Sequence, residues 1–442
     1  MIDIQETHIA HRRVDWQSET QKNRLQSRYR KEKIFKTIAV LCLSVAIAAL
    51  LVVLGSIFTT GISGFKETRI EVDIYVDQQI IGKIPSLNPS ELKDYYATIN
   101  INGLLIKSLQ KKFKDVTSRR DVFSLLKLFS VGAQSEIRNA LIANPELIGK
   151  THTISLLSSS IVDMLIKGKI SRDVSENNRK ISDKQIAWLD QFISERKLSQ
   201  NFNWTFFNNG DSREPELAGV KSATVGSLLT LFVTFIISFP IGVGTAIYLE
   251  EFAPKNRYTD LIEININNLA AVPSIIFGLL GLAIFIGFIG LPRSAPLVGG
   301  LTLALTTLPT IIITARAAIK AVPPSIKEAA IGLGASHMQM VFHHVLPLSM
   351  PGILTGSIIG MAQALGETAP LLMIGMVAFI VDTPGGIMEA STALPVQVYL
   401  WADSPERGFL EKTSAAIMVL LFFLIVMNGL AIWMRQKFEK KW

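Results

Sequence analysis

One carboxylate, Glu367, lies inside a hydrophobic run, where a charge is unfavourable. It belongs to the segment 363–370 (Gln-Ala-Leu-Gly-Glu-Thr-Ala-Pro), beside a glycine and shortly before a proline. Because Pro370 has no backbone N–H, it leaves a backbone carbonyl free in the preceding turn. An ionisable group at membrane depth is a candidate functional residue. The sequence allows an alternative equally well, in which a paired or protonated Glu367 fixes a kinked helix to its neighbour.

Other residues with catalytic or metal-binding potential do not have the spacing of a site. His343 and His344 are adjacent, and adjacent residues on a helix point about 100° apart, so they suit joint metal ligation poorly. Residues 149–151 (Gly-Lys-Thr) resemble the end of a phosphate-binding P-loop, but Asn144 stands where the first glycine is required. Cys42 is the single cysteine, which excludes an intrachain disulfide. We therefore expect neither catalysis nor a metal site in this chain.

A polar segment, residues 323–347, separates two long apolar runs. Residues 325–328 (Ser-Ile-Lys-Glu) have the spacing of a capping box behind two prolines, and Gly334 can end the short helix that follows. Residues 336–339 (Ser-His-Met-Gln) form a second box, which predicts another helix. The segment is thus predicted to be a pair of short helices held in water between membrane spans.

Composition and apolar runs place the chain among polytopic membrane proteins. Hydrophobic residues make up 49% of its 442 residues, and charged residues make up 18%. A helix needs roughly 20 apolar residues to cross about 30 Å of hydrocarbon. The predicted fold is therefore all-α with six transmembrane helices. The six runs are 34–59, 224–248, 269–290, 297–319, 353–380 and 415–434.

Lysine and arginine near the ends of these runs predict the orientation. Basic residues gather in 24–36, before the first run, and in 435–441, after the last, and such clusters stay in the cytoplasm. Residues 1–33 and 436–442 are thus expected to be cytoplasmic tails, and 323–347 a cytoplasmic loop. These flanks and anionic lipid explain the net charge of +8 without a nucleic-acid partner. The first run is too long for a signal peptide, so it is expected to remain as a span.

Residues 64–218 are far more polar than the runs around them, and in this orientation they lie outside the cytoplasm. A segment of about 150 residues can form its own core. Residues 70–76 alternate apolar and polar, as a half-buried strand does, whereas 122–128 have helical spacing and 182–185 form a capping box. An inserted α+β extracytoplasmic domain is predicted, followed by a permease-like region, 220–435, that holds the other five helices.

Two patterns within the runs concern packing. Gly352, Gly356 and Gly360 recur every four residues, so one face of the fifth predicted helix can approach a neighbour closely. Residues 271–278 (Ala-Val-Pro-Ser-Ile-Ile-Phe-Gly) interrupt the third run with a proline and small residues. Such breaks occur at membrane depth where the backbone lines a cavity or packs on protein.

Four motifs, taken in order, resemble the PstA family, the membrane subunits of high-affinity phosphate ABC importers. They cover most of the chain from about Ser222 onward. The motif in the polar segment resembles the EAA loop of ABC-importer permeases, so the bundle is expected to have the fold of a type I ABC-importer permease. The four motifs are 270–285, 328–347, 366–372 and 392–405.

The resemblance implies a permease subunit in the bacterial inner membrane, transporting phosphate with several partners. These are a PstC-like permease, a PstB-like ATPase dimer and a PstS-like periplasmic phosphate-binding protein. ATP and Mg²⁺ would be bound by the ATPase, and this chain would bind no cofactor. The residues implied in coupling to the ATPase are Glu328, Ala329, Ala330, Gly334, Leu346 and Pro347. Those expected along the translocation path are Gln363, Glu367, Thr368 and Arg316.

Two positions depart from the family pattern. The family commonly has Arg at the place of Gln363 and often at about Ile313, and an oxyanion in a low-dielectric path needs donors or positive charge. Glu367 would repel an anion unless it were protonated or paired with a cation, such as Arg316 or one from the PstC-like permease. A permease for phosphonate, sulfate or molybdate is therefore the alternative. A membrane sensor is a weaker one, because only about eight residues follow the sixth run. The sequence leaves the role of 64–218 and the subunit stoichiometry open.

Overall fold

The computed structural model describes residues 19–81, 95, 99–144, 147–377 and 379–438. The chain divides into two units, residues 1–57 and residues 58–442. Helix α1 (Glu19–Gly64) supplies the first unit, and its last turns belong to the second. It is long and apolar enough to cross a membrane, and it contains the predicted run 34–59. Residues 1–18 and 439–442 of the predicted tails lie outside the described residues.

A three-stranded antiparallel sheet opens the second unit. Its strands are β1 (Lys66–Tyr75), β2 (Thr151–Leu157) and β3 (Leu198–Phe202), in the order β2-β1-β3. Ile70 pairs with Leu156 on one side and with Leu198 on the other. Ile70, Val72 and Ile74 are buried, as the alternation predicts.

Helices cover this sheet and complete an inserted α+β domain (residues 65–219). Ser182 and Gln185 form the predicted capping box at the start of α8, and the predicted helix at 122–128 is α5. Leu104, Leu128, Ile137 and Phe192 belong to the domain's core. The α+β prediction is confirmed. The described helices of the domain are α2 (Gln78–Ile81), α4 (Ile101–Lys112), α5 (Arg119–Leu126), α6 (Ala133–Ala143), α7 (Ser160–Ile166), η2 (Glu176–Asn178), α8 (Asp183–Ser194) and α9 (Trp204–Asn208).

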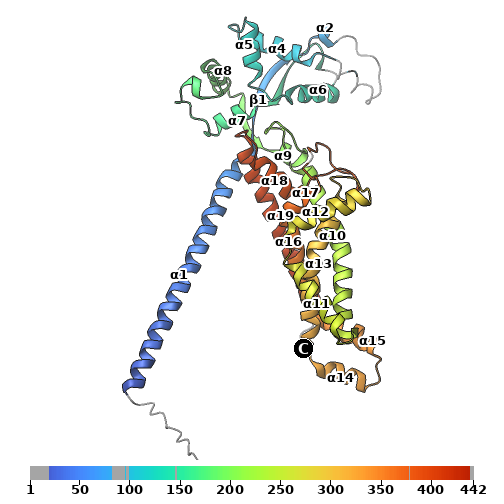
Figure 1. Cartoon of the computed structure of the whole chain (residues 1–442). Coiled ribbons are helices and arrows are strands. Elements are labelled where there is room, and N and C mark those ends of the chain that lie inside the picture. The colour runs from blue at the N-terminus through green and yellow to red at the C-terminus, as the bar shows by residue number, and fades with distance from the viewer. Residues whose placement is uncertain (1–18, 82–94, 96–98, 145–146, 378, 439–442) are drawn as a thin grey trace, which may run out of the picture. The chain divides into compact units, whose positions relative to one another are not determined.

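A bundle of apolar helices follows the inserted domain (Figure 1). Its long members are α10 (Lys221–Ile247), α13 (Pro296–Lys320), α16 (Leu346–Gly366) and α19 (Phe409–Phe438). Helix α11 (Arg257–Ala270) and α12 (Ser274–Gly281), which continues into the π-helical turn η4 (Leu282–Phe288), form a pair bent by 99°. With α1, the described residues contain five single helices able to span a membrane, or six when the bent pair counts as one span.

Two predicted runs do not form continuous helices. The run 269–290 breaks between α11 and α12, because Pro273 has no N–H to continue the first helix and instead precedes the second. The run 353–380 ends as a helix at Gly366, where Glu367 turns to an extended backbone (ψ 119°). Pro370 then lies in the first turn of a short new helix, α17 (Ala369–Met373). The predicted number of six spans is therefore reached only when the bent pair α11–α12 counts as one span. The predicted bounds of these two runs were wrong.

The predicted glycine face of α16 packs on α13. A Cβ at Gly352 would point at Ala318, one at Gly356 would overlap Thr314, and one at Gly360 would point at Ile311. Close approach without side chains brings the two backbones together and gains van der Waals contact. The packing prediction is confirmed, and α13 becomes the centre of the bundle, with α10 on another side.

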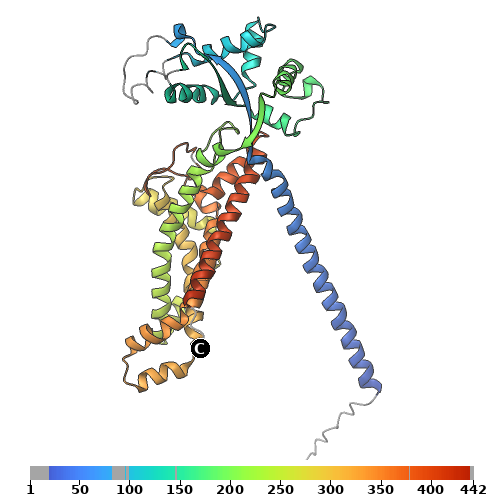
Figure 2. The ribbon, with the colours of Figure 1, turned by 180° about the vertical axis from the view of Figure 1, so that it is seen from behind.

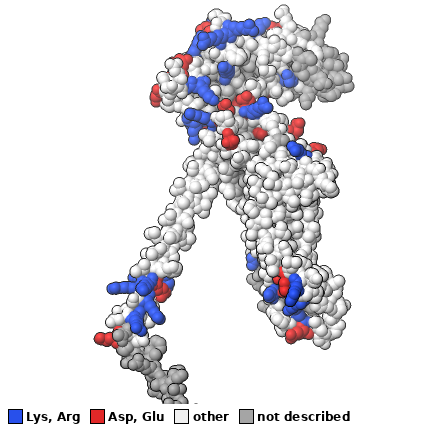
Figure 3. Space-filling view, in the orientation of Figure 1, with Lys and Arg blue, Asp and Glu red and all other residues white. Residues whose placement is uncertain are grey.

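The bundle has two distinct ends, which Figures 1 and 2 show from opposite sides. The loop end carries α14 (Pro324–Gly332) and α15 (His337–Met340), and the domain end adjoins the inserted domain. Helix α18 (Leu394–Ala402) is buried at the domain end, where Gln397 donates to the carbonyl of Gly219 at 2.9 Å. In Figure 3 charged side chains gather at both ends and the middle of the bundle is free of them on that face, as expected for a surface in contact with lipid.

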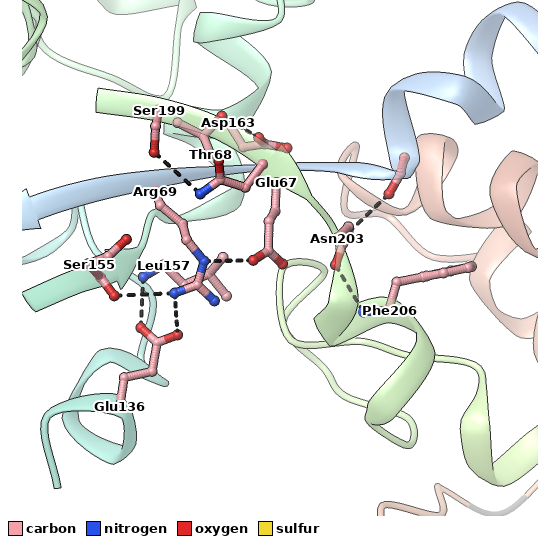
Figure 4. A network of polar contacts seen from close by, with 12 residues as sticks. Glu67, Thr68, Arg69, Glu136, Ser155, Leu157, Asp163, Ser199, Asn203 and Phe206 are labelled. Atoms are coloured by element: carbon pink, nitrogen blue, oxygen red, sulfur yellow. Dashed lines mark hydrogen bonds and ion pairs between the residues drawn. The ribbon is translucent and has the colours of Figure 1, made fainter. Parts of the chain in front are cut away.

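A buried polar network ties the inserted domain to the bundle. Figure 4 shows its part around β1, where Glu67 accepts from Arg69 at 2.7 Å and Asp163 accepts from the Thr68 hydroxyl at 2.6 Å. Lys167, the C-cap of α7, donates to Asp163 at 2.5 Å and to Glu411, in the first turn of α19, at 3.1 Å. The side chain of Lys167 is only 6% exposed, so it has few water molecules to replace a lost partner.

Candidate functional site

The loop end carries the segment predicted to couple the chain to an ATPase. Helix α14 begins earlier than predicted, because Pro323 is its N-cap and Pro324 its first residue; Ser325 lies inside the helix and forms no capping box. Gly334 follows the end of α14 with φ +88°, a conformation that favours glycine, so the predicted stop is confirmed. The second box, at 336–339, is present at the start of α15.

The predicted coupling residues lie on this one segment, on different faces. Glu328, Ala329 and Gly334 are exposed, and Leu346 with Pro347 begins α16 half-buried. Ala330 is 5% exposed and belongs to a core cluster with Met340 and Val341. A larger side chain than alanine would not fit there without moving α14. The structure thus gives Ala330 a packing role, and the coupling role of all six residues stays a prediction.

Four bulky apolar side chains on the same segment point away from the protein. Ile331, Leu333, Met338 and Phe342 are 51%, 90%, 58% and 47% exposed. A group of exposed apolar side chains in a polar loop is typical of a surface that binds a partner. The sequence analysis missed these residues, although large apolar residues in a segment predicted to lie in water are a detectable signal.

The predicted path residues lie at the end of α16. Gln363 is exposed on the last turn of the helix, Glu367 is its half-buried C-cap, and Thr368 is the N-cap of α17. Gln363 and Glu367 are about one helical turn apart, as predicted. Within the part of the chain that the structure describes, no hydrogen bond or ion pair is found for the Glu367 carboxylate.

Arg316, one of the cations suggested as a partner for Glu367, does not pair with it. Its guanidinium lies 2.6 Å from Glu263 of α11 and 3.4 Å from Glu250, which follows α10. Since Gly356 faces Thr314, Arg316 lies slightly nearer the loop end and Glu367 eleven residues nearer the domain end. At 1.5 Å per residue this places them about 20 Å apart along the helix axes. The spacing in the sequence could not reveal which helices lie antiparallel at which level.

An open face, with polar groups among aliphatic ones, flanks the contact between α13 and α16. Thr306, Thr310 and Ile313 recur on one side of α13, and Ile313 is 38% exposed. On α16, Ile359 is 55% exposed and Gln363 is also exposed. These five residues are called the open face below. The sequence analysis found Gln363 and Ile313 and missed the two threonines and Ile359.

The two interrupted segments of the sequence meet beside this face. A Cβ on Gly278 of α12 would lie 2.7 Å from the Cα of Pro370 in α17, so the two short helices touch closely. Backbone that leaves the helical path at membrane depth must be covered by protein or line a watery cavity. Helix α12 thus covers the backbone just after the break at 367–368, about one helical turn from Gln363.

Comparison with known proteins agrees with this architecture. Residues 238–442 match the family model described as "Binding-protein-dependent transport system inner membrane component", and residues 22–176 match a domain of unknown function, DUF3333.

Three relatives are similar to a large part of this chain. The "Probable ABC transporter permease protein YqgI" of Bacillus subtilis is 28% identical over 60% of this chain and 98% of its own length. "Phosphate transport system permease protein PstA 1" of Mycobacterium tuberculosis is 32% identical over 49% of this chain and 71% of its own length. "Phosphate transport system permease protein PstC" of Haemophilus influenzae is 32% identical over 48% of this chain and 73% of its own length.

The spanning helices, the exposed loop segment and the family model define the class, a multi-pass membrane permease of an ABC transporter. Within that class, the chain belongs to the PstA family of phosphate transport system permease proteins.

Proposed function

We propose that this chain is the membrane-spanning permease subunit of an ATP-driven phosphate importer. It lies in the bacterial inner membrane with both termini in the cytoplasm, so the loop end faces the cytoplasm and the inserted domain faces the periplasm. A PstS-like binding protein delivers phosphate, and a PstC-like permease completes the path.

The observation that carries this proposal is the open face. Hydroxyl and amide groups lie along one side of α13 and α16, among the exposed aliphatic side chains of Ile313 and Ile359. Hydroxyl and amide N–H donors can replace part of the hydration shell of an anion. Thr306 already donates to the carbonyl of Leu303, so the donors that the open face offers are Thr310 and Gln363. One subunit leaves the face uncovered, and a second permease packed against it would enclose a path. The names of the PstA and PstC relatives support phosphate as the anion.

The exposed surface of α14 and α15 supports coupling to a PstB-like ATPase dimer. Glu328 and Ala329 are exposed beside the apolar group of Ile331 and Leu333, which a partner would cover. ATP and Mg²⁺ are bound by that partner, and this chain serves as a transport subunit.

A permease for another oxyanion is the second candidate. The neutral side chains of Gln363 and Ile313 favour it, because the PstA family commonly has arginine at the first position and often has it at about the second. Phosphonate, sulfate and molybdate differ from phosphate in charge or protonation, so a site without fixed positive charge could prefer one of them.

Competition in reconstituted vesicles separates these candidates. The complete complex is placed in proteoliposomes with its binding protein and internal ATP. Uptake of radiolabelled phosphate is measured with an excess of unlabelled phosphate or of each other oxyanion, and uptake of each other oxyanion is measured in parallel. The proposal expects ATP-dependent phosphate uptake that unlabelled phosphate alone suppresses. Uptake of sulfate, molybdate or a phosphonate in preference to phosphate would instead establish the second candidate.

A further inference from the structure

Helix α10 ends in two adjacent glutamates that need cations from elsewhere. Glu250 and Glu251 lie in the π-helical turn Tyr248–Phe252, called the acidic turn below. The backbone carbonyls at the end of a helix carry partial negative charge, which opposes a carboxylate at that position. Both side chains are also mostly buried, 19% and 5% exposed respectively, so water compensates them little.

Lys327 of α14 supplies the charge for Glu251. Its ammonium nitrogen lies 2.5 Å from Oε1 of Glu251, with the lysine side chain 24% exposed. A charge-assisted bond with one nearly buried partner is short and directional. Removing the lysine would leave Glu251 buried without its cation, which is far less favourable than losing an exposed pair.

Helix α15 contacts the same turn. The Nε2 of His337 donates to the carbonyl oxygen of Glu251 at 2.8 Å, and its ring meets that of Phe252 edge to face at 5.1 Å. Both short helices of the loop end are therefore attached to the end of α10 by polar contacts of fixed geometry.

Arg316 extends the connection to two further helices. From α13 it donates to Glu250 of the acidic turn and to Glu263 of α11. The acidic turn thus joins α10, α11, α13 and the α14–α15 pair. Apolar contacts between Ala330 or Met340 and the bundle are also present, but such contacts are non-directional.

Lys327, which holds the acidic turn, is the neighbour of Glu328, which is exposed to a partner. Neighbouring residues on a helix point about 100° apart, so Lys327 turns towards the acidic turn while Glu328 is exposed. The same turn of α14 presents one side to a partner and holds α10 with the other.

We infer that the Glu251–Lys327 ion pair links α14 rigidly to the end of α10, so that the two helices move together. Lys327 is then a positioning residue for transport. The inference rests on the proposed function, because it assumes that α14 receives motion from an ATPase. It assigns to the acidic turn the transfer of that motion to the spanning helices.

The test compares transport with ATP hydrolysis in the reconstituted complex. Lys327→Gln and Glu251→Gln are each expected to lower the number of anions transported per ATP by roughly fivefold or more, the lower range of measured couplings between sites. ATP hydrolysis stimulated by the binding protein should persist, because the partner-facing side of α14 is unchanged. A residue with only a structural role would lower transport and hydrolysis together. Lys320→Gln is the matched control, since Lys320 is exposed at the end of α13 and belongs to no ion pair among the described residues.

A charge-swapped double variant, Glu251→Lys with Lys327→Glu, keeps the pair and is expected to recover at least half of the wild-type ratio. A wild-type ratio in both single variants would overturn the inference, as would a double variant no better than Lys327→Gln. Failure of the proposed function looks different, because the wild-type complex itself would then transport no phosphate. The ratio could still be measured with whichever oxyanion it carries.

Discussion

The contact between α13 and α16 gives a prediction whose size follows from the structure. A Cβ added at Gly352 would lie 2.6 Å from the Cβ of Ala318. Carbon atoms in contact prefer about 3.5–4.0 Å, so Gly352→Ala requires the helices to separate by about 1 Å. Neither atom can rotate away, because each is bonded directly to a backbone carbon. Overpacking of this kind costs about 1–3 kcal/mol.

Gly360→Ala is the matched control for this change. Its Cβ would meet Ile311 at 3.5 Å, an ordinary contact, and it gains the same helix propensity as Gly352→Ala. The difference between the two variants therefore isolates the overlap. Ala318→Gly should rescue Gly352→Ala, because the next atom of Ala318 lies 3.6 Å away.

The assay is the free energy of unfolding in mixed detergent micelles, measured for the two single variants and the rescued double variant. We expect Gly352→Ala to be less stable than Gly360→Ala by about 1–3 kcal/mol, with most of the loss recovered in the double variant. Equal stability of the two single variants would refute the close packing of these helices. A loss that Ala318→Gly does not relieve would show that the overlap lies elsewhere.

Three further changes test other parts of the structure. Gly334→Asp places a β-carbon where φ is +88°, so it should uncouple ATP hydrolysis from uptake while the complex still assembles; wild-type uptake at normal expression would count against this. Burial raises the pKa of Asp211, despite the bond donated by Trp401 at 2.9 Å, so its stabilising contribution is present below the unfolded pKa of about 4 and is lost as the pH rises through the folded value. As the pH rises above about 4, wild type should therefore lose thermal stability relative to Asp211→Asn. A difference that stays constant with pH would contradict this. Lys167→Met breaks the buried ion pair with Glu411 of α19 and should increase hydrogen exchange in β1. Lys180→Met is the control, because the ion pair of Lys180 with Glu406 is exposed and weak. Equal hydrogen exchange in both variants would contradict this.

Local signals in the sequence predicted local features of the fold. The alternation around Ile70 marks a strand because one side of the sheet is buried, and the boxes at 182–185 and 336–339 mark helix starts through bonds between near neighbours. Gly334 marks a helix end for the same kind of reason. The prediction at 325–328 failed because Pro323 and Pro324 start the helix without a side-chain cap.

Features that depend on the meeting of distant segments could not be predicted in this way. Hydropathy alone extends the fifth run through Glu367, whereas the backbone turns at that residue and α17 packs on Gly278 of α12. The partners of Arg316 lie 53 and 66 residues away in the sequence. Local motifs and the family resemblance pointed to the candidate residues of the site, and the three-dimensional arrangement decides which of them lie together.

Phosphate uptake by two variants at the end of α16 tests most directly the claim that this face lines the path. Gln363→Arg adds positive charge where Gln363 is exposed, so uptake should be preserved or raised, because the anion gains a charged donor. Glu367→Leu removes the half-buried carboxylate at the helix break and should impair uptake, with both variants compared at matched expression in the complete complex. Uptake that is abolished by Gln363→Arg and unaffected by Glu367→Leu would contradict the account and place the anion's path elsewhere.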